Sequence, residues 1–240
     1  MVDVYYGATE DHPFRILQEP LEPLLTSYKE GMASYDALGS VTSCPSMIRF
    51  MRNRFVIKAP VDITIYQNSE GIVVAYNESS VAKELIGAFL TRTDMNDPYS
   101  PISQQTLQML DNDYLLFVSD TPLEMEITPP FLHNSPMFGI AGSFDIGRWV
   151  RPVSFASIYL KGVDKTYIKR GDPIMYVKFM TEEKVNLHRS YVNSKVLSIT
   201  RQCVNLKKAL PKQSLSKQYE LADNISAASM AIKEMQSCQY

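Results

Sequence analysis

The chain has few of the residues that build metal sites. Of its 240 residues only three are histidine, namely His12, His133 and His188, and none of them stands in an HxH, HxD or HExxH pair. Those spacings place two ligands on one face of a strand or helix. Their absence disfavours a metal-dependent cupin or a facial-triad oxygenase. We therefore assign no metal ligands and no cofactor.

Motifs of nucleophilic catalysis and of phosphate binding are also missing. The chain has no GxSxG elbow, and its glycine-containing turns at residues 142–147 and 170–173 lack the GxGxxG and GxxxxGK[ST] spacings. Those spacings let backbone amides hold phosphate groups. We assign no catalytic residues, and the sequence favours a protein that is not an enzyme without excluding one.

Cysteine, long apolar runs and charge of one sign are scarce as well. The three cysteines lie far apart at positions 44, 203 and 238, which is typical of free thiols in a reducing compartment. No run of about 18 apolar residues and no basic-then-apolar leader occurs, so neither a membrane span nor secretion is expected. With 24 basic and 26 acidic residues the formal charge is −2, which provides no overall attraction to nucleic acid. These features predict a cytoplasmic protein with no membrane partner, and they disfavour a nucleic-acid partner.

Short apolar segments separated by turn residues fill the middle of the chain. The runs with strand character are residues 55–58, 61–66, 72–76, 114–119, 123–127, 136–146, 149–160 and 173–179. The sequence QNSEG before the third run has the length of a hairpin turn. Many short strands at close intervals indicate a mainly β protein, built as an antiparallel sandwich, jelly roll or barrel.

The two ends of the chain have a different character. Residues 1–40 contain Pro13, Pro20 and Pro23, which exclude a long helix, and we expect an extended N-terminal arm with a turn or two of helix after residue 24. The Cys-Pro pair at 44–45 precedes apolar residues at helical spacing and predicts a short helix. We divide the chain into the arm at 1–40, a β-rich core domain at 41–210, and a C-terminal amphipathic helix with its tail at 211–240.

An apolar seam runs along the C-terminal helix expected over residues 214–236. Its members are spaced four, three, four and three positions apart, which places them on one helix face. They are Leu221, Ile225, Ala228, Ile232 and Met235. Because an isolated helix of this length is marginal in water, the seam must be buried on the protein's own sheet or on a partner. We expect it to contribute to self-association or partner binding, and we therefore expect a homo-oligomer.

Basic residues alternate with aromatic residues in three places. They are Arg49, Arg52 and Arg54 before Phe55, Arg148 and Arg151 on either side of Trp149, and Lys161, Lys165, Lys169 and Arg170 around Tyr167. Such groups suit the anchors of a protein interface. In the alternative interpretation Trp149 belongs to the core and the arginines form a solvated rim. We predict that Trp149 is largely buried, and we name it as an interface candidate.

Four residues are candidates for binding a ligand, namely His133, Asp145, Arg148 and Arg151. His133 lies beside Asn134 in a proline-bounded loop, and the other three surround the single tryptophan. A pocket lined by such groups would favour an enzyme or a small-molecule binder. A flat, apolar, self-complementary surface would favour assembly.

Two stretches carry a family resemblance. They are CPSMIRFMRNRFVIKAPVDITI from residue 44, and FDIGRWVRPVSFASIYL from residue 144 through IKRGDPIMYVKF up to residue 179. With its Cys-Pro start, VIKAP strand and GDP turn before an apolar strand, the chain resembles uncharacterised proteins encoded by tailed phages, especially marine ones. The similarity covers residues 41–180 and implies a viral origin. On this basis we expect a non-enzymatic structural or interaction protein of the host cytoplasm or the virion, whose partner is a phage protein, a host protein or another copy of itself.

A pattern-level similarity to the trimeric dUTPase and deaminase β-barrel is the source of the alternative function. It rests on a long strand after a glycine-containing turn and on the GDP turn before the last core strand. The glycine-rich C-terminal arm that closes over a nucleotide in that family is replaced here by polar residues 214–240. The alternative is a small-molecule or nucleotide-binding protein or enzyme, dUTPase-like or cupin-like, with its pocket between the sheet and residues 77–113.

Overall fold

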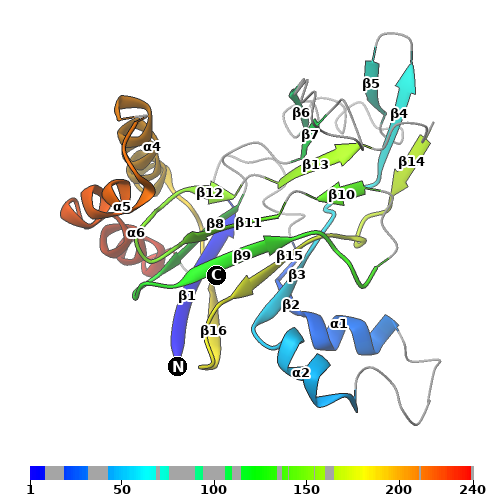
Figure 1. The fold of residues 1–240 in the computed structure, drawn as a ribbon, viewed down its shortest axis with the longest axis horizontal. Coiled ribbons are helices and arrows are strands. Elements are labelled where there is room, and N and C mark those ends of the chain that lie inside the picture. The colour runs from blue at the N-terminus through cyan, green and yellow to red at the C-terminus, as the bar shows by residue number, and fades with distance from the viewer. Residues whose placement is uncertain are drawn as a thin grey trace.

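The computed structural model describes the chain in twelve stretches, which are residues 1–8, 19–31, 43–68, 71–75, 90–93, 106–109, 115–133, 137–139, 141–153, 155–159, 165–210 and 212–238. Within them the strands form four sheets, two of which share the main hydrophobic core. Helices lie on both sides of this pair (Figure 1). The protein is thus a mixture of strands and helices.

The first sheet has the strand order β12-β8-β1-β16. Its strands are β1 (Val2–Ala8), β8 (Leu115–Ser119), β12 (Pro152–Val153) and β16 (Val185–Arg189). β1 is antiparallel to β8 and parallel to β16, so it lies in the middle of the sheet. The expectation that the N-terminal residues form an extended arm is therefore wrong for residues 2–8, because both edges of this strand are paired.

The second sheet has the order β11-β9-β15-β3-β2 and is antiparallel throughout. Its strands are β2 (Glu22–Pro23), β3 (Arg54–Lys58), β9 (Glu124–Thr128), β11 (Gly142–Asp145) and β15 (Pro173–Phe179). Side chains alternate between its two faces. In β9 the buried residues are Met125 and Ile127, whereas Glu124, Glu126 and Thr128 are more exposed. One face of this sheet therefore belongs to the core and the other is the outer face.

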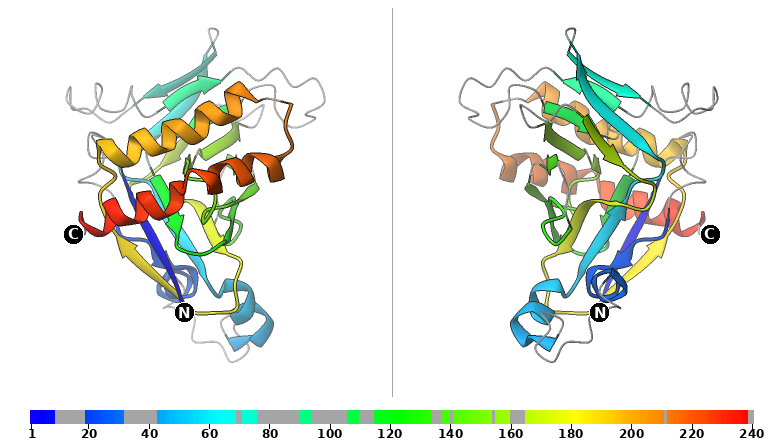
Figure 2. Two further views of the ribbon diagram at one scale, coloured as in Figure 1. Left: turned by 90° about the vertical axis from the view of Figure 1, so that its left-hand side faces the viewer. Right: turned by 90° about the vertical axis from the view of Figure 1, so that its right-hand side faces the viewer.

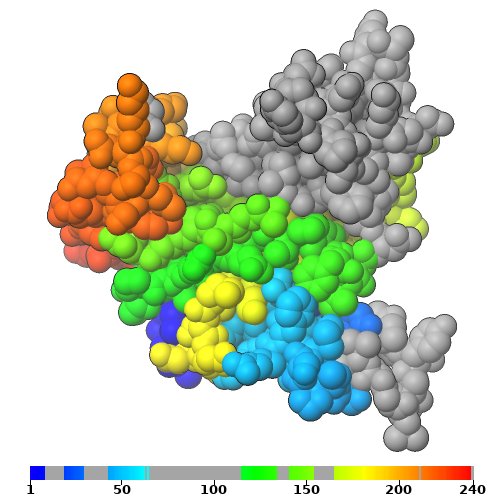
Figure 3. All heavy atoms as spheres, in the orientation of Figure 1, coloured from blue at the N-terminus to red at the C-terminus, as the bar shows by residue number. Residues whose placement is uncertain are grey.

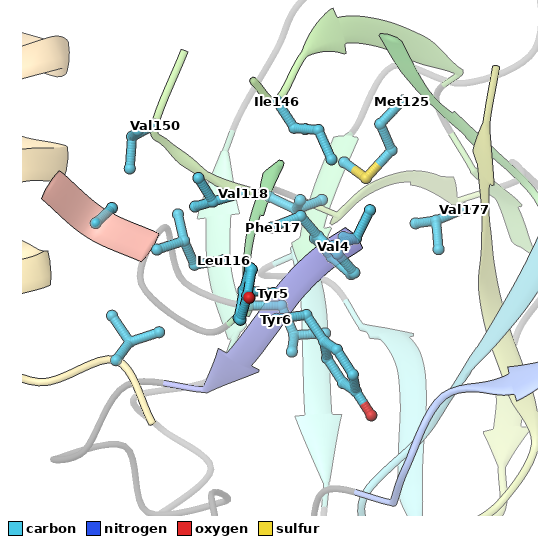
Figure 4. Close-up of a cluster of buried hydrophobic side chains, with 14 of the residues drawn as sticks. Val4, Tyr5, Tyr6, Leu116, Phe117, Val118, Met125, Ile146, Val150 and Val177 are labelled. Atoms are coloured by element: carbon cyan, nitrogen blue, oxygen red, sulfur yellow. The ribbon is translucent and has the colours of Figure 1, made fainter. Parts of the chain in front are cut away.

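The two sheets pack face to face through aromatic side chains. The ring of Phe117 in β8 lies 6.0 Å from that of Tyr6 in its own sheet and 6.1 Å from that of Phe179 in the second sheet. Figure 4 shows Val4 and Phe117 on the same side of β1 as Val177. Aromatic pairs at these distances add to the free energy of burial. The two sheets therefore share one core through these rings, and neither of them closes into a barrel within the described residues.

Three helices cover the other face of the first sheet. They are α4 (Ser194–Ala209), α5 (Leu215–Asn224) and α6 (Ala227–Gln236). α6 contacts β1 and β8, and α4 contacts α5 and α6, so the three form one layer (Figure 2). The Asn193 side chain accepts hydrogen bonds from the backbone N–H groups of Lys195 and Val196 and so caps α4. The prediction of a mainly β fold missed α4 and so underestimated the helical content.

Two short helices lie against the outer face of the second sheet. They are α1 (Leu24–Gly31) and α2 (Pro45–Met51), and Pro45 stands at the start of α2 as the sequence predicts. A second cluster of buried residues joins them to the sheet and consists of Leu24, Met51, Val56 and Tyr176. The order of layers is thus helices α4 to α6, first sheet, second sheet, and helices α1 and α2.

Two smaller sheets complete the strand pairing. One has the order β10-β13-β7-β6, with β6 (Leu90–Thr93), β7 (Thr106–Met109), β10 (Met137–Gly139) and β13 (Phe155–Tyr159). The other has the order β14-β4-β5, with β4 (Ile63–Asn68), β5 (Gly71–Ala75) and β14 (Lys165–Ile168). The antiparallel pairing of β4 with β5 confirms the predicted hairpin. Most of residues 77–113, where an alternative pocket was predicted, lie outside the described residues.

The C-terminal segment differs from the single helix that was predicted over residues 214–236. The chain leaves α5 after Asn224 and enters α6 at Ala227, and Ser226 between them has a left-handed backbone with φ of 51°. A non-glycine residue in this conformation interrupts a helix. None of the helices among the described residues is long and apolar enough to span a membrane.

The predicted apolar seam is divided between the core and its margin. Ile232 and Met235 are 7% and 0% exposed and belong to the main hydrophobic cluster. The remaining three are half-buried, namely Leu221, Ile225 and Ala228. Since α6 lies on the first sheet, the buried part of the seam is not a free face for another molecule.

Replacing Met235 with alanine tests this docking. Removal of a fully buried methionine leaves a cavity, and we expect the free energy of unfolding to fall by about 2–5 kcal/mol in chemical denaturation. Met230 lies on the same helix and is 40% exposed, so Met230→Ala is the matched control, with an expected loss of less than about 1 kcal/mol. An unchanged stability for Met235→Ala together with a changed oligomeric mass would assign the residue to an interface.

Candidate functional site

Arg54 is the most buried charged side chain on the outer face of the second sheet. It opens β3, where alternation turns Phe55 into the core and leaves Arg54 on the other face, yet it is only 2% exposed. Its guanidinium donates to Glu126 Oε1 at 3.1 Å and to Thr128 Oγ1 at 2.9 Å, both from β9. Its Nε is buried and has no hydrogen-bond partner. One carboxylate therefore neutralises a cation that is almost fully removed from water.

Two phenylalanines cover this guanidinium. The Arg54 Cζ lies 4.6 Å from the ring centroid of Phe50, in α2, and 5.3 Å from that of Phe131. The two ring centroids are 5.4 Å apart, and the rings are inclined by 57°. Both are nonetheless open to solvent, with 38% and 46% of their surface exposed. Phe50 and Phe131, here called the aromatic patch, thus lie between a buried cation and water, a placement that cation–π attraction stabilises.

The surroundings of the aromatic patch are basic. Lys178 Nζ lies 5.6 Å from the Phe50 ring centroid. Arg49 and Arg52 both pair with Glu182, at 3.1 and 3.5 Å, where α2 meets the segment before β16 (Figure 3). Counting Arg54 and Glu126 as well, these contacts join four cations and two carboxylates. The patch is therefore positive on a chain whose net charge is −2.

His133, one of the predicted ligand-binding residues, contacts the tyrosine against which Phe131 packs. Its Nδ1 is hydrogen-bonded to the hydroxyl of Tyr176, and Phe131 packs edge-on against the same tyrosine ring at 5.0 Å. Burial raises the pKa of Tyr176 to about 12 and lowers the pKa of His133. Tyr176 is therefore protonated at pH 7, and it links His133 to Phe131 of the aromatic patch.

Burial also lowers the pKa of Arg54, while the adjoining Glu126 carboxylate raises it. An arginine in a protein stays protonated even so. Removal of Glu126 would leave a buried charge without its counterion, which is the costly arrangement for such a pair. The pair therefore fixes the guanidinium under the two rings.

Asp145 and Arg148, predicted as ligand-binding residues, instead join the sheet to α5. Asp145 Oδ1 accepts hydrogen bonds from the backbone N–H groups of Leu123 and Gly147 at 3.0 and 2.9 Å. Arg148 donates twice to Asp223 Oδ2, at 2.9 and 2.6 Å. Their contacts and those of His133 have no residue in common. The structure thus separates His133 from the other predicted ligand-binding residues.

Trp149 is 4% exposed, which confirms that it is largely buried. Its ring lies 6.1 Å from that of Tyr219 in α5. Arg151, the fourth candidate, stacks on Phe144 with 4.6 Å between its Cζ and the ring centroid. Trp149, Arg151, Phe144 and Tyr219 line one cleft of about 280 Å³ between β11 and the helices.

Histidines, carboxylates and cysteines are the remaining groups that could carry chemistry. No group of three or more His, Cys, Asp or Glu side chains that could hold a metal ion occurs among the described residues. Cys44, Cys203 and Cys238 are free thiols. Backbone N–H groups of Met47 and Ser46 lower the pKa of the exposed Cys44, and burial raises the pKa of Cys203.

Sequence reasoning found only part of these arrangements. It noted Arg54 in a basic and aromatic stretch, and Phe50 lies in the same stretch, but Phe131 and Tyr219 were not named. Phe131 follows two prolines in a loop, and Tyr219 lies in a polar helix. The one available signal was that each is an aromatic residue within a segment of otherwise polar or turn-forming residues.

No model of a known protein family matches the chain, and a search of curated proteins finds no match either.

The pKa of Cys44 is lowered and that of Cys203 is raised, so the two thiols should differ in reactivity. At pH 7.5 we expect iodoacetamide to alkylate Cys44 about tenfold or more faster than Cys203, because the reactive thiolate is both more populated and more accessible at Cys44. Peptide mass spectrometry over time measures both rates in one sample. In urea, where the protein unfolds, the alkylation rates of Cys44 and Cys203 should approach each other. Equal rates in the native protein would contradict the burial of Cys203.

Proposed function

We propose that the protein is a non-enzymatic interaction protein, of the tailed-phage kind that its sequence resembles, which binds another protein through the aromatic patch. The observation that carries the proposal is the pair of exposed phenylalanines held over the buried Arg54–Glu126 ion pair. Large aromatic side chains and arginine dominate the binding energy of protein interfaces. An exposed aromatic pair of this kind is otherwise a liability for solubility.

The fixed positions of the two rings support a role in binding. Arg54 holds both from beneath, and Tyr176 packs against the edge of Phe131. A side chain that is already ordered loses little conformational entropy when a partner covers it. The aromatic patch is therefore suited to act as an anchor without rearrangement.

The charge around the patch favours an acidic partner over a second copy of the chain. A two-fold symmetric dimer through this surface would place the same net positive patch on both sides of the interface, and like charges brought together at an interface are costly. A surface with an apolar side chain flanked by carboxylates would instead meet complementary charge. The predicted homo-oligomer has no support from this patch.

The ring geometry supports a protein partner over a single-stranded nucleic acid. Bases stack on aromatic faces that are open and flat to the strand. Here the rings are inclined by 57° and pack on one another and on Arg54.

The test first captures proteins from phage-infected host cells with the wild type and with the Phe50→Ala/Phe131→Ala variant. The captured protein is then purified, and its dissociation constant is measured for each. We expect the double variant to bind it about 30-fold or more weakly, as is usual for loss of a pair of aromatic anchors. Tyr167→Ala is the matched control, since it removes an aromatic side chain of similar exposure, 43%, from β14. It should bind as wild type does.

A second variant keeps the test valid if the double alanine variant is unstable. Arg49→Glu/Lys178→Glu leaves the rings in place and reverses charge at the margin, and we expect a slower association that also loses its salt dependence. An unchanged dissociation constant in both variants would overturn the proposal. The proposal would also be overturned if wild type and Tyr167→Ala captured no protein in common. A wild-type dimer that becomes monomeric in the double alanine variant would overturn it as well.

A further inference from the structure

A second site of different chemistry lies away from the aromatic patch, in the cleft between β11 and the helical layer. The cleft encloses about 280 Å³. Its lining includes Phe144 from β11, Lys207 from α4, and Gln218 and Tyr219 from α5. Trp149 and Arg151, from the segment between β11 and β12, also line the cleft.

Arg151 is a half-buried cation without a counterion. It forms no ion pair with a carboxylate anywhere in the described stretches, and its buried Nε has no hydrogen-bond partner. Burial lowers the pKa of its guanidinium. Two other arginines differ in this respect, because Arg148 pairs with Asp223 and Arg54 pairs with Glu126. A charge removed from water without a partner is destabilising, so this position is unfavourable unless something else supplies the negative charge.

The described residues of the lining add positive charge. Lys207, in the last turn of α4, is the second cation, and none of the described lining residues is an aspartate or a glutamate. Gln218 is only 7% exposed and adds an amide group. Arginine presents a planar set of donors that matches carboxylate and phosphate oxygens. The polar part of the cleft is therefore suited to an anion.

Three aromatic side chains in the lining, Phe144, Trp149 and Tyr219, are held in place. Trp149 and Phe144 are 4% and 8% exposed. The hydroxyl of Tyr219 accepts a hydrogen bond from the backbone N–H of Asp145 at 3.0 Å, and the Arg148 guanidinium lies 5.2 Å from its ring centroid. These contacts fix the tyrosine beside the tryptophan. The apolar part of the cleft is thus already formed.

We infer that this cleft binds a small organic anion, in which a carboxylate or phosphate group meets Arg151 and Lys207 while a flat apolar body packs against Phe144, Trp149 and Tyr219. The inference is independent of the aromatic patch and its protein partner. The volume of about 280 Å³ lies just below the usual range of ligand sites, which suits a single ring with its acidic group. No covalent step is involved.

The single tryptophan makes the site directly observable. Its indole N–H gives one signal in a ¹H–¹⁵N spectrum of the labelled full chain, and this signal reports on the cleft wall. The probes are phenyl phosphate, benzoate and the neutral benzyl alcohol. A ligand of this size is expected to bind in about the millimolar range. We expect saturable shifts of the indole signal with at least one of the two anions and none with benzyl alcohol. The anion that binds more tightly shows whether the cleft prefers a phosphate or a carboxylate group.

Substitutions assign the binding to the cations. Arg151→Gln should weaken the better anion about tenfold or more, as expected for loss of charged hydrogen bonds. Arg201→Gln is the matched control, because Arg201 is exposed on α4 outside the lining, and it should bind as wild type does. If Arg151→Gln does not fold, Lys207→Gln replaces it, with an expected loss of about threefold or more.

Three results would overturn the inference. They are a benzyl alcohol shift equal to that of the anions, no shift with any probe in the millimolar range, and an unchanged affinity in the cleft variants. A benzyl alcohol shift equal to that of the anions would show that the cleft binds apolar rings without recognising the anionic group. None of the three depends on whether the aromatic patch binds a protein.

Discussion

The fold depends on the burial of β1 and β8 on both of their faces. Val4 and Phe117 are fully buried toward the second sheet, while Leu116 and Val118 are buried on the opposite side. A strand pair that is apolar on both faces needs a layer on each side, so the second sheet and the α4 to α6 layer are both required. Gly7 is part of the same constraint, since a Cβ there would lie 1.8 Å from the carbonyl oxygen of Ser190, beside β16.

Local sequence patterns predicted those helices and strands that their own residues determine, through an apolar run or a proline at the start of a helix. The apolar run at 114–119 was predicted as a strand, and Pro45 marked the start of α2. The central place of β1 could not be predicted this way, because it is decided by pairing with β16, at the far end of the chain. The stripe Val196, Ile199, Thr200 and Cys203 has helical spacing and is buried in α4. This signal was present in the sequence and was missed, since its polar members hid the periodicity.

The candidate sites show where sequence reasoning stops. Arginine beside aromatic residues was recognised around Arg54 and around Arg151, and both guanidiniums do lie over phenylalanine rings. Over Arg54, the ring of Phe50 comes from the same stretch and that of Phe131 from a distant loop, whereas Phe144 lies seven residues before Arg151. Nor could the sequence tell which arginine has a counterion, because Glu126 reaches Arg54 only after β9, β15 and β3 have paired.

Strand β9 accounts for the difference between the two arginines. Its side chains alternate, so Glu126 lies on the outer face with Arg54, while its neighbour Ile127 turns to the side on which the cleft opens. The face that β9 presents to the core is apolar and offers Arg151 no carboxylate. Among the described residues, β9 therefore neutralises the arginine beneath the aromatic patch and supplies no counterion to the arginine of the cleft. The first arrangement stabilises a surface, and the second leaves room for an anion from solution.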